Sequence, residues 1–441
     1  MRQTHSAPGR WGRIRWLVGL VCLLQAGDAC QVLSAQAGQQ SVVLVALDAF
    51  HPSYLDRPVS RHLRSLARDG VRARWLVPVF PTKTFPNFHS IATGLYPEHH
   101  GIVSNNMRDS VLGRFALWER DAVRDPRWWG GEPIWVTAVR QGRRTASFFW
   151  PGSDVAIQGV RPHHYRTYDR AVSNADRVRQ VLEWLSLTGE HSFSLITLYL
   201  GDVDYAGHEF GPDAPETDSA IARVDSAVGA LMSGIRARKL EHRVNVVVVS
   251  DHGMARVDPR QVVYLDDFIG PDSIDLIDEG SFVALAPVGM SVEQLYRRLR
   301  RAHPRLTIYR KSEVPAAYHY RNHPRIPPII GTLSDGWTAT TRRAAAERER
   351  VSLGEHGYPP ERESMRAIFL ARGPAFKEGA VVEPFQNIHI YTLLAHVLGL
   401  RPAPNDGRLD SVRVMLIGPA RTGGRTGGPT HRRRRRHLTE P

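Results

Sequence analysis

The sequence predicts an α/β protein with a mostly parallel central sheet that is covered by helices on both faces. Short, mostly apolar runs, typical of strands buried on both sides, lie at residues 42–47, 146–150, 193–200, 244–249 and 366–370. Helical patterns lie between these runs, and strands that alternate with helices favour a parallel sheet. The chain has 441 residues, of which 42% are apolar and 23% charged. That length suits one large domain, alone or with an insert.

The clearest helical pattern extends from residue 217 to about residue 240. Its apolar stripe consists of Ile221, Val224, Val228, Leu231 and Ile235. Residues 258–354 differ from this pattern, because they combine Pro-rich turns with a helix-like stretch at 291–302. Ser291 and Gln294 fit a capping box at the start of that stretch. We therefore predict an inserted subdomain at about 258–354 within a larger domain at 42–405.

The first 37 residues have the pattern of a signal peptide. A basic start precedes a short apolar run at 16–24, and Ala35 and Ala37 offer small-residue cleavage sites. The run is shorter than the ~20 apolar residues that span a bilayer. We expect export to the periplasm or the medium and no transmembrane segment in the mature protein. A retained membrane anchor, or a lipoprotein formed on Cys30, is the alternative. The two cysteines, Cys22 and Cys30, both lie in this segment, so no catalytic thiol is expected.

The basic charge of the chain is concentrated at its ends. The net charge is +14, of which residues 1–41 carry +3 and residues 420–441 carry +6, leaving +5 for the rest. Arg432 to Arg436 follow a Gly-rich stretch, which is typical of a disordered, solvated tail over 420–441. Such a tail favours contact with a surface or a polyanion as an alternative role. We expect no specific nucleic-acid binding.

Acidic residues directly follow three of the predicted strands. Asp48 follows residues 42–47, Asp202 and Asp204 follow residues 193–200, and Asp251 with His252 follows residues 244–249. In open α/β sheets, functional sites lie beyond the carboxyl ends of the strands. A single Asp there is usually a helix cap, but three such strand ends predict a common acidic rim.

Histidines add nitrogen ligands to these carboxylates and indicate a metal site. His208 and His252 lie close to the strand-end Asp residues, and His356 lies further along the chain. The candidate ligands are Asp48, Thr84, Asp204, His208, Asp251, His252 and His356. Three imidazoles favour zinc or another transition metal, since magnesium and calcium prefer oxygen alone. Zinc commonly takes four ligands, so this set would serve two Zn²⁺ ions. The sequence therefore predicts a two-zinc centre.

Thr84 lies in the segment Pro81-Thr-Lys-Thr-Phe-Pro-Asn87 and is the candidate nucleophile. A threonine hydroxyl is a weak nucleophile at neutral pH, but zinc lowers the pKa of an oxygen that it binds. The structural alternative is that Thr84 caps a helix beginning near Asn87. Both roles are compatible.

These residues lie within motifs that resemble the nucleotide pyrophosphatase/phosphodiesterase family of the alkaline phosphatase superfamily. Besides the Thr84 segment, the motifs are Thr93-Gly-Leu-Tyr-Pro-Glu98, His100-Gly-Ile-Val103, Asn105-Asn-Met107, Phe149-Trp-Pro-Gly-Ser-Asp154, Asp204-Tyr-Ala-Gly-His208, Ser250-Asp-His-Gly-Met254 and His356-Gly-Tyr358. The resemblance covers about residues 42–404 and is closest to the single-domain bacterial members. It implies an alkaline phosphatase-like phosphodiesterase domain.

The resemblance also implies the roles of individual residues. One zinc would bind Asp204, His208 and His356, and the other Asp48, Thr84, Asp251 and His252. Asn105 and the Phe85 N–H would both donate hydrogen bonds to a phosphate oxygen. The Phe85 and Tyr168 rings would hold a nucleobase between them. A threonyl–nucleotide intermediate would form on Thr84 and release nucleoside monophosphates.

Two other functions compete with a nucleotide substrate. The same fold could act on choline-phosphate lipids or on phosphate monoesters. A monoester carries one more negative oxygen, which favours an Arg partner, and none accompanies the matched motifs. The other alternative is a polyanion-binding surface protein that depends on the Arg-rich tail.

Overall fold

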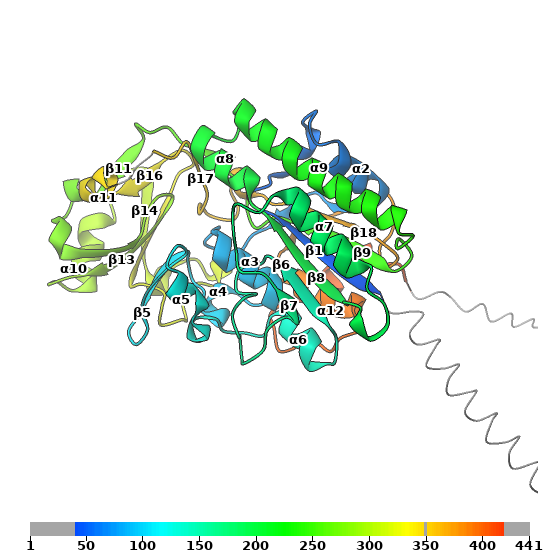
Figure 1. Ribbon diagram of the computed structural model, residues 1–441. Coiled ribbons are helices and arrows are strands. Elements are labelled where there is room, and N and C mark those ends of the chain that lie inside the picture. Colours follow the sequence, from blue (N-terminus) through cyan, green and yellow to red (C-terminus); the bar gives the residue numbers. More distant parts are fainter. Residues whose placement is uncertain (1–39, 348–350, 419–441) are drawn as a thin grey trace, which may run out of the picture.

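The computed structural model describes residues 40–347 and 351–418, and its centre is an eight-stranded sheet (Figure 1). The signal peptide and the Arg-rich tail that the sequence predicts lie outside the described residues. In spatial order, the strands are β19 (Ala380–Val382), β2 (Val71–Ala73), β18 (Phe369–Arg372), β9 (Val244–Val249), β1 (Ser41–Leu47), β8 (Leu195–Leu200), β6 (Thr145–Phe148) and β7 (His164–Tyr165).

Most of this sheet is parallel, as the sequence predicts. Strands β9, β1, β8, β6 and β7 run in one direction, whereas β18 runs antiparallel to both of its neighbours. Every residue of β1, β8 and β9 is buried. Apolar residues therefore line both faces of these strands, because helices cover both faces.

Two groups of helices form the outer layers (Figure 1). One face carries α2 (Arg61–Asp69), α7 (Asn174–Leu185) and α9 (Pro215–Ala237); the other carries α3 (Thr84–Thr93), α6 (Ile134–Arg140) and α12 (His389–Val397). The predicted helix at 217–240 is α9, and its apolar stripe is buried. It begins two residues before the predicted start because Pro215, whose φ is preset for a helix, occupies its first turn. Within the described residues, no helix is both long and apolar enough to cross a membrane.

The predicted strand at 366–370 begins later than expected. It is β18, which starts at Phe369, because Ala367 pairs instead with Leu76 of β3 (Leu76–Val77). The amide nitrogen of each of these two residues lies within 3.0 Å of the other's carbonyl oxygen. The apolar pattern located the buried segment correctly but not the residue at which it joins the main sheet.

A second, antiparallel sheet lies to one side of the main sheet (Figure 1). Its strands in spatial order are β12 (Ile274–Asp278), β13 (Phe282–Pro287), β15 (Ile329–Leu333) and β14 (Leu306–Arg310). Helix α10 (Val292–Leu299) packs on it and has the predicted capping box between Ser291 and Gln294. We propose this sheet and α10 as the core of the inserted subdomain. The segments that lead into and out of it, β10 (Ala255–Arg256) and β17 (Gly354–Glu355), pair with each other.

Candidate active site

The register of the central strands aligns the polar residues that follow them. Leu47 pairs with Leu200 and Ala46 pairs with Val249, so β1, β8 and β9 end at the same edge of the sheet. Asp48 follows β1 directly, and Asp251 lies two residues beyond β9. Helix α8 (Asp202–Phe210) begins just after β8. The strand ends therefore bring together carboxylates that are far apart in sequence.

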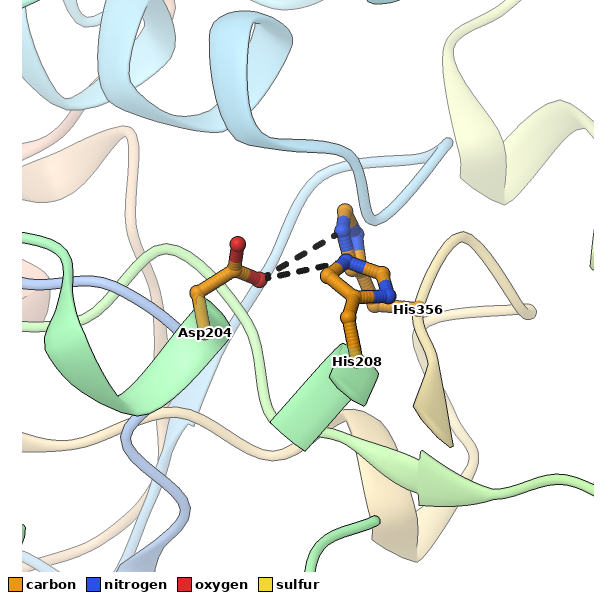
Figure 2. A group of neighbouring side chains, drawn as sticks. All are labelled: Asp204, His208 and His356. Atoms are coloured by element: carbon orange, nitrogen blue, oxygen red, sulfur yellow. Dashed lines mark ion pairs between the residues drawn. The ribbon is translucent and has the colours of Figure 1, made fainter. Parts of the chain in front are cut away.

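Asp204, His208 and His356 form the first of two clusters at this edge (Figure 2). Asp204 and His208 lie one turn apart on α8, and His356 directly follows β17. The Oδ1 atom of Asp204 is 3.4 Å from Nε2 of His208 and 3.7 Å from Nε2 of His356. Figure 2 shows both imidazole rings beside the Asp204 carboxylate. These distances are short enough for one cation to contact all three side chains.

Asp48, Thr84, Asp251 and His252 form the second cluster. The Nε2 atom of His252 is 2.9 Å from Asp251 Oδ2, 3.6 Å from Asp48 Oδ1 and 3.3 Å from Thr84 Oγ1. The two clusters adjoin each other, because one ligand atom each of Asp48, Asp204 and His252 lie within 4.8 Å of one another. The structure thus brings all seven predicted ligands to one place.

Backbone carbonyls orient the three histidines. The Nδ1 atom of His208 is 2.8 Å from the Gly354 carbonyl, that of His252 is 2.9 Å from the Gly253 carbonyl, and that of His356 is 2.9 Å from the Thr82 carbonyl. A ring that donates through Nδ1 in its neutral form has its lone pair on Nε2. Metal-binding histidines are commonly oriented by such a bond. With Nδ1 held in this way, each ring turns its Nε2 atom toward the carboxylates, as a metal ligand requires.

The carboxylates in these clusters have oxygens without hydrogen-bond donors. Within the described residues, Asp48 Oδ1, Asp204 Oδ1 and Asp251 Oδ2 are buried and have no hydrogen-bond partner. Burial raises the pKa of Asp48 well above its ordinary value, and the charges of Asp251 and Asp204 raise it further. Burial lowers the pKa of the His208 imidazole, but the charge of Asp204 outweighs this effect and raises that pKa to about 9. The clustered carboxylates therefore favour a positive charge among them, whether a proton or a metal ion. The residues present therefore fit a bound transition-metal ion.

Thr84 is the first residue of α3, and Lys83 occupies the N-cap position. The helix does not begin near Asn87, and the structure records no side-chain capping bond at its start. The capping role that the sequence left open for Thr84 is therefore not what the structure shows. The Thr84 hydroxyl instead lies beside His252. It is at the N-terminus of a ten-residue helix, where the helix dipole favours an anion.

The structure corrects one expectation about the phosphate donors. The Phe85 N–H does not face the site as a free donor, because it donates to Oδ1 of Asn105 at 2.9 Å. This bond orients the Asn105 amide and leaves its Nδ2 group for another acceptor. Asn105 is buried and lies just before β4 (Asn106–Asp109). Of the two expected donors, only Asn105 is available.

Phe85 and Tyr168 are both half-buried and have separate aromatic neighbours. The Phe85 ring lies 5.8 Å from the Trp129 ring, whereas the Tyr168 ring lies 5.1 Å from that of Phe149. The Tyr168 hydroxyl forms a 2.5 Å hydrogen bond with the hydroxyl of Tyr205, which follows Asp204 in the chain. Aromatic neighbours thus pack against each ring. A hydrogen bond also links Tyr168 to the residue next to Asp204 of the first cluster.

Two residues that the sequence patterns did not single out support the clusters. The Tyr199 hydroxyl donates to Asp48 Oδ2 at 2.6 Å, and Thr82 donates to the Tyr358 carbonyl at 2.8 Å while its own carbonyl contacts His356. A tyrosine within the mostly aliphatic strand β8 was a signal for the first. Thr82 had no signal beyond its place in the Thr84 segment.

Carboxylates, imidazoles and a hydroxyl lie together at the strand ends of a parallel α/β sheet. This arrangement is typical of metal-dependent hydrolases. The sequence model of the Type I phosphodiesterase / nucleotide pyrophosphatase family matches residues 42–359. The chain belongs to this family and is a phosphoric diester hydrolase. The resemblance inferred from the motifs is confirmed.

Individual relatives support the same conclusion. The chain is 34% identical over 395 residues to the human ectonucleotide pyrophosphatase/phosphodiesterase family member 5, covering 89% of this chain and 82% of that protein. It is 34% identical over 387 residues to the bis(5'-adenosyl)-triphosphatase of Mus musculus, covering 87% and 83%. A solved structure of an inactive variant of the murine ectonucleotide pyrophosphatase/phosphodiesterase 5, in complex with AMP, matches with a TM-score of 0.81 at 35% identity, covering 86% of this chain and 100% of that chain.

Proposed function

We propose that this protein is a two-zinc phosphodiesterase that hydrolyses nucleotide diesters and pyrophosphates to nucleoside monophosphates. The observation that carries the proposal is the Thr84 hydroxyl, which lies 3.3 Å from Nε2 of His252 inside a cluster of carboxylates and imidazoles. The AMP complex of the murine relative and the name of the mouse relative, a bis(5'-adenosyl)-triphosphatase, support a nucleotide substrate.

The two clusters divide into two sets of metal ligands. Asp204, His208 and His356 would hold one ion, and Asp48, Thr84, Asp251 and His252 would hold the other. Bound zinc would lower the pKa of the Thr84 hydroxyl and neutralise charge on the substrate phosphate. The mixture of imidazole and carboxylate donors favours zinc over magnesium or calcium.

The reaction on Thr84 would be a double displacement. The Thr84 hydroxyl would lose its proton to solvent, and its Oγ would attack the phosphorus in line. The bond from phosphorus to the leaving oxygen would break, and that oxygen would depart with the electron pair and take up a proton from solvent. Asn105, held through Oδ1, would donate its Nδ2 hydrogen to a non-bridging oxygen as charge develops there. Water would then attack the threonyl–nucleotide ester and release Thr84 and the nucleoside monophosphate. Two in-line steps predict net retention of configuration at phosphorus.

A panel of three nitrophenyl substrates tests this proposal. A nitrophenyl nucleotide should be hydrolysed with a kcat/KM at least about tenfold above those of nitrophenyl phosphorylcholine and nitrophenyl phosphate. The physical reason is that Asn105 is neutral and would stabilise the extra charge of a monoester poorly, whereas aromatic rings suit a base. If the phosphorylcholine ester is the best substrate, the lipid alternative holds instead, and preference for nitrophenyl phosphate would identify a monoesterase.

Phe85→Ala tests the proposed base-binding role. Stacking of a base on an aromatic ring contributes roughly 1–3 kcal/mol, so the KM for a nitrophenyl nucleotide should rise about tenfold. The KM for methyl nitrophenyl phosphate, which has no base, should change little. Tyr165→Ala provides a control, because Tyr165 is an exposed aromatic residue on the edge strand β7. Equal effects of Phe85→Ala on both substrates would remove the stacking role.

The two ends of the chain carry further parts of this proposal. We infer export to the periplasm or the medium from the signal-peptide pattern at residues 1–37, and a solvated tail with surface or polyanion contacts from residues 420–441.

A further inference from the structure

The connection between β12 and β13 reaches the candidate active site from the second sheet. Asp278, the last residue of β12, is 3% exposed. One of its carboxylate oxygens accepts a hydrogen bond from the Ser104 hydroxyl. The other accepts from Asn106 Nδ2 at 3.0 Å and from the Glu279 N–H at 3.0 Å. A single buried carboxylate thus holds two residues that lie on either side of Asn105.

Asn105 itself is held from a third direction. Its Oδ1 accepts from the Phe85 N–H at 2.9 Å, which ties it to the residue after the proposed nucleophile. With both neighbours bound to Asp278, the backbone around Asn105 has little freedom to rotate. The direction of its Nδ2 group therefore depends on Asp278, which is not one of the candidate metal ligands.

The same connection also contacts the metal side of the site. The Ser281 hydroxyl donates to the carbonyl oxygen of His356 at 2.5 Å. A Cβ atom at Gly357, whose φ is +116°, would lie 2.6 Å from both Ser281 Oγ and Lys83 Cε. The loop after His356 is thus packed directly against the β12–β13 connection, and glycine is required there. Residues 278–281 touch both the phosphate side and the metal side of the site.

We propose that Asp278 is a positioning residue for hydrolysis, which holds Ser104 and Asn106 so that Asn105 Nδ2 faces the transferred phosphoryl group. This inference rests on the proposed function, because it takes Asn105 as the phosphate donor. A carboxylate suits the task, since its two oxygens accept from both donors at once and present no N–H to them. Burial raises the pKa of Asp278, whereas the charge of Lys83 and the hydrogen bonds from Ser104 and Asn106 favour its ionised form. Hydrogen bonds to an ionised carboxylate are the stronger and better-directed ones.

The test is a double-mutant cycle between Asp278→Ala and Asn105→Ala. Asp278→Ala should lower kcat for a nitrophenyl nucleotide about tenfold, with unchanged metal content and little change in KM. In the Asn105→Ala background, the same substitution should lower kcat by less than about twofold, because the group that it positions is already absent. A merely structural role would give the same loss in both backgrounds and would overturn the proposal. Unchanged kcat in the single variant would overturn it too.

Asp275→Ala provides the matched control. Asp275 lies on the same strand and binds Arg108 of β4 at 2.9 Å, but it contacts neither neighbour of Asn105. Its loss should leave kcat within about twofold of wild type. An equal loss in this variant would mean that any loosening between β12 and β4 slows the enzyme, and would overturn the specific role of Asp278.

Two further measurements keep the outcome decisive. If Asp278→Ala does not fold, Ser104→Ala removes one of the two held donors with the carboxylate in place, and the cycle with Asn105→Ala should again be non-additive. Additive losses would overturn the proposal. Failure of the proposed function would appear separately, as an absence of diesterase activity in the wild type. Wild-type kcat in Asn105→Ala would overturn both the role of Asn105 and that of Asp278.

Discussion

Replacing Thr84 by alanine should abolish hydrolysis while leaving the bound metal in place. Loss of the attacking oxygen should lower kcat for a nitrophenyl nucleotide at least about 10³-fold, as removal of a catalytic nucleophile commonly does. The metal should remain because the second cluster keeps three of its four candidate ligands, Asp48, Asp251 and His252. Steady-state kinetics and metal analysis of the same preparation measure both quantities. Near-normal turnover would refute Thr84 as the nucleophile.

Two substitutions distinguish loss of the Thr84 hydroxyl from damage to helix α3. Thr84→Ser keeps an oxygen at the first position of α3 and should retain measurable turnover. Thr93→Ala removes a hydroxyl at the other end of the same helix, where it donates to the His89 carbonyl at 2.7 Å. That variant should keep near wild-type activity per folded molecule. If Thr93→Ala were as inactive as Thr84→Ala, the loss would reflect damage to α3 rather than to the reaction.

Removing the metal should eliminate activity and also weaken the fold. Chelation should reduce hydrolysis to background, and added Zn²⁺ should restore it at about two equivalents per chain. The unbonded oxygens of Asp48, Asp204 and Asp251 would then face one another without a cation. We therefore expect the melting temperature to fall by about 5 °C or more. Elemental analysis, kinetics and thermal unfolding of the same stripped sample provide the measurements.

Asp204→Asn and Asp202→Asn form a matched pair for this experiment. The two residues lie on the same turn of α8, but the Asp202 carboxylate faces away from the clusters and binds Asn174 and Arg223. Asp204→Asn should lose metal and activity, whereas Asp202→Asn should keep both. A sample without measurable metal that still hydrolyses the substrate would contradict the two-zinc proposal.

Much of the fold could be predicted because buried parallel strands leave a local signature. The runs at 42–47 and 244–249 match β1 and β9, since strands covered on both faces are apolar at most positions. The capping box at Ser291 was likewise local, because it depends on two residues three apart. Strand ends were harder to predict, as β18 shows, since a pairing partner elsewhere decides where a strand begins.

The candidate ligands were predictable for a related reason. Carboxylates and imidazoles that directly follow buried strands are chemically distinctive, and the sheet topology places such positions on one edge. Their shared location was therefore foreseeable before any pairing was known. Which ring faces which carboxylate was not, because the Thr82, Gly253 and Gly354 carbonyls orient the histidines.

Residue type and order along this chain thus specified the fold class, the family and the candidate ligands, because these depend on local apolar pattern and side-chain chemistry. Contacts between distant segments came from folding alone. The register of β1 with β8 and β9 aligned the strand ends, the Phe85 N–H was taken by Asn105, and the second sheet placed Asp278 beside Ser104. Hydrogen-bond direction depends on where two backbones meet in space, and no short stretch of sequence contains that information.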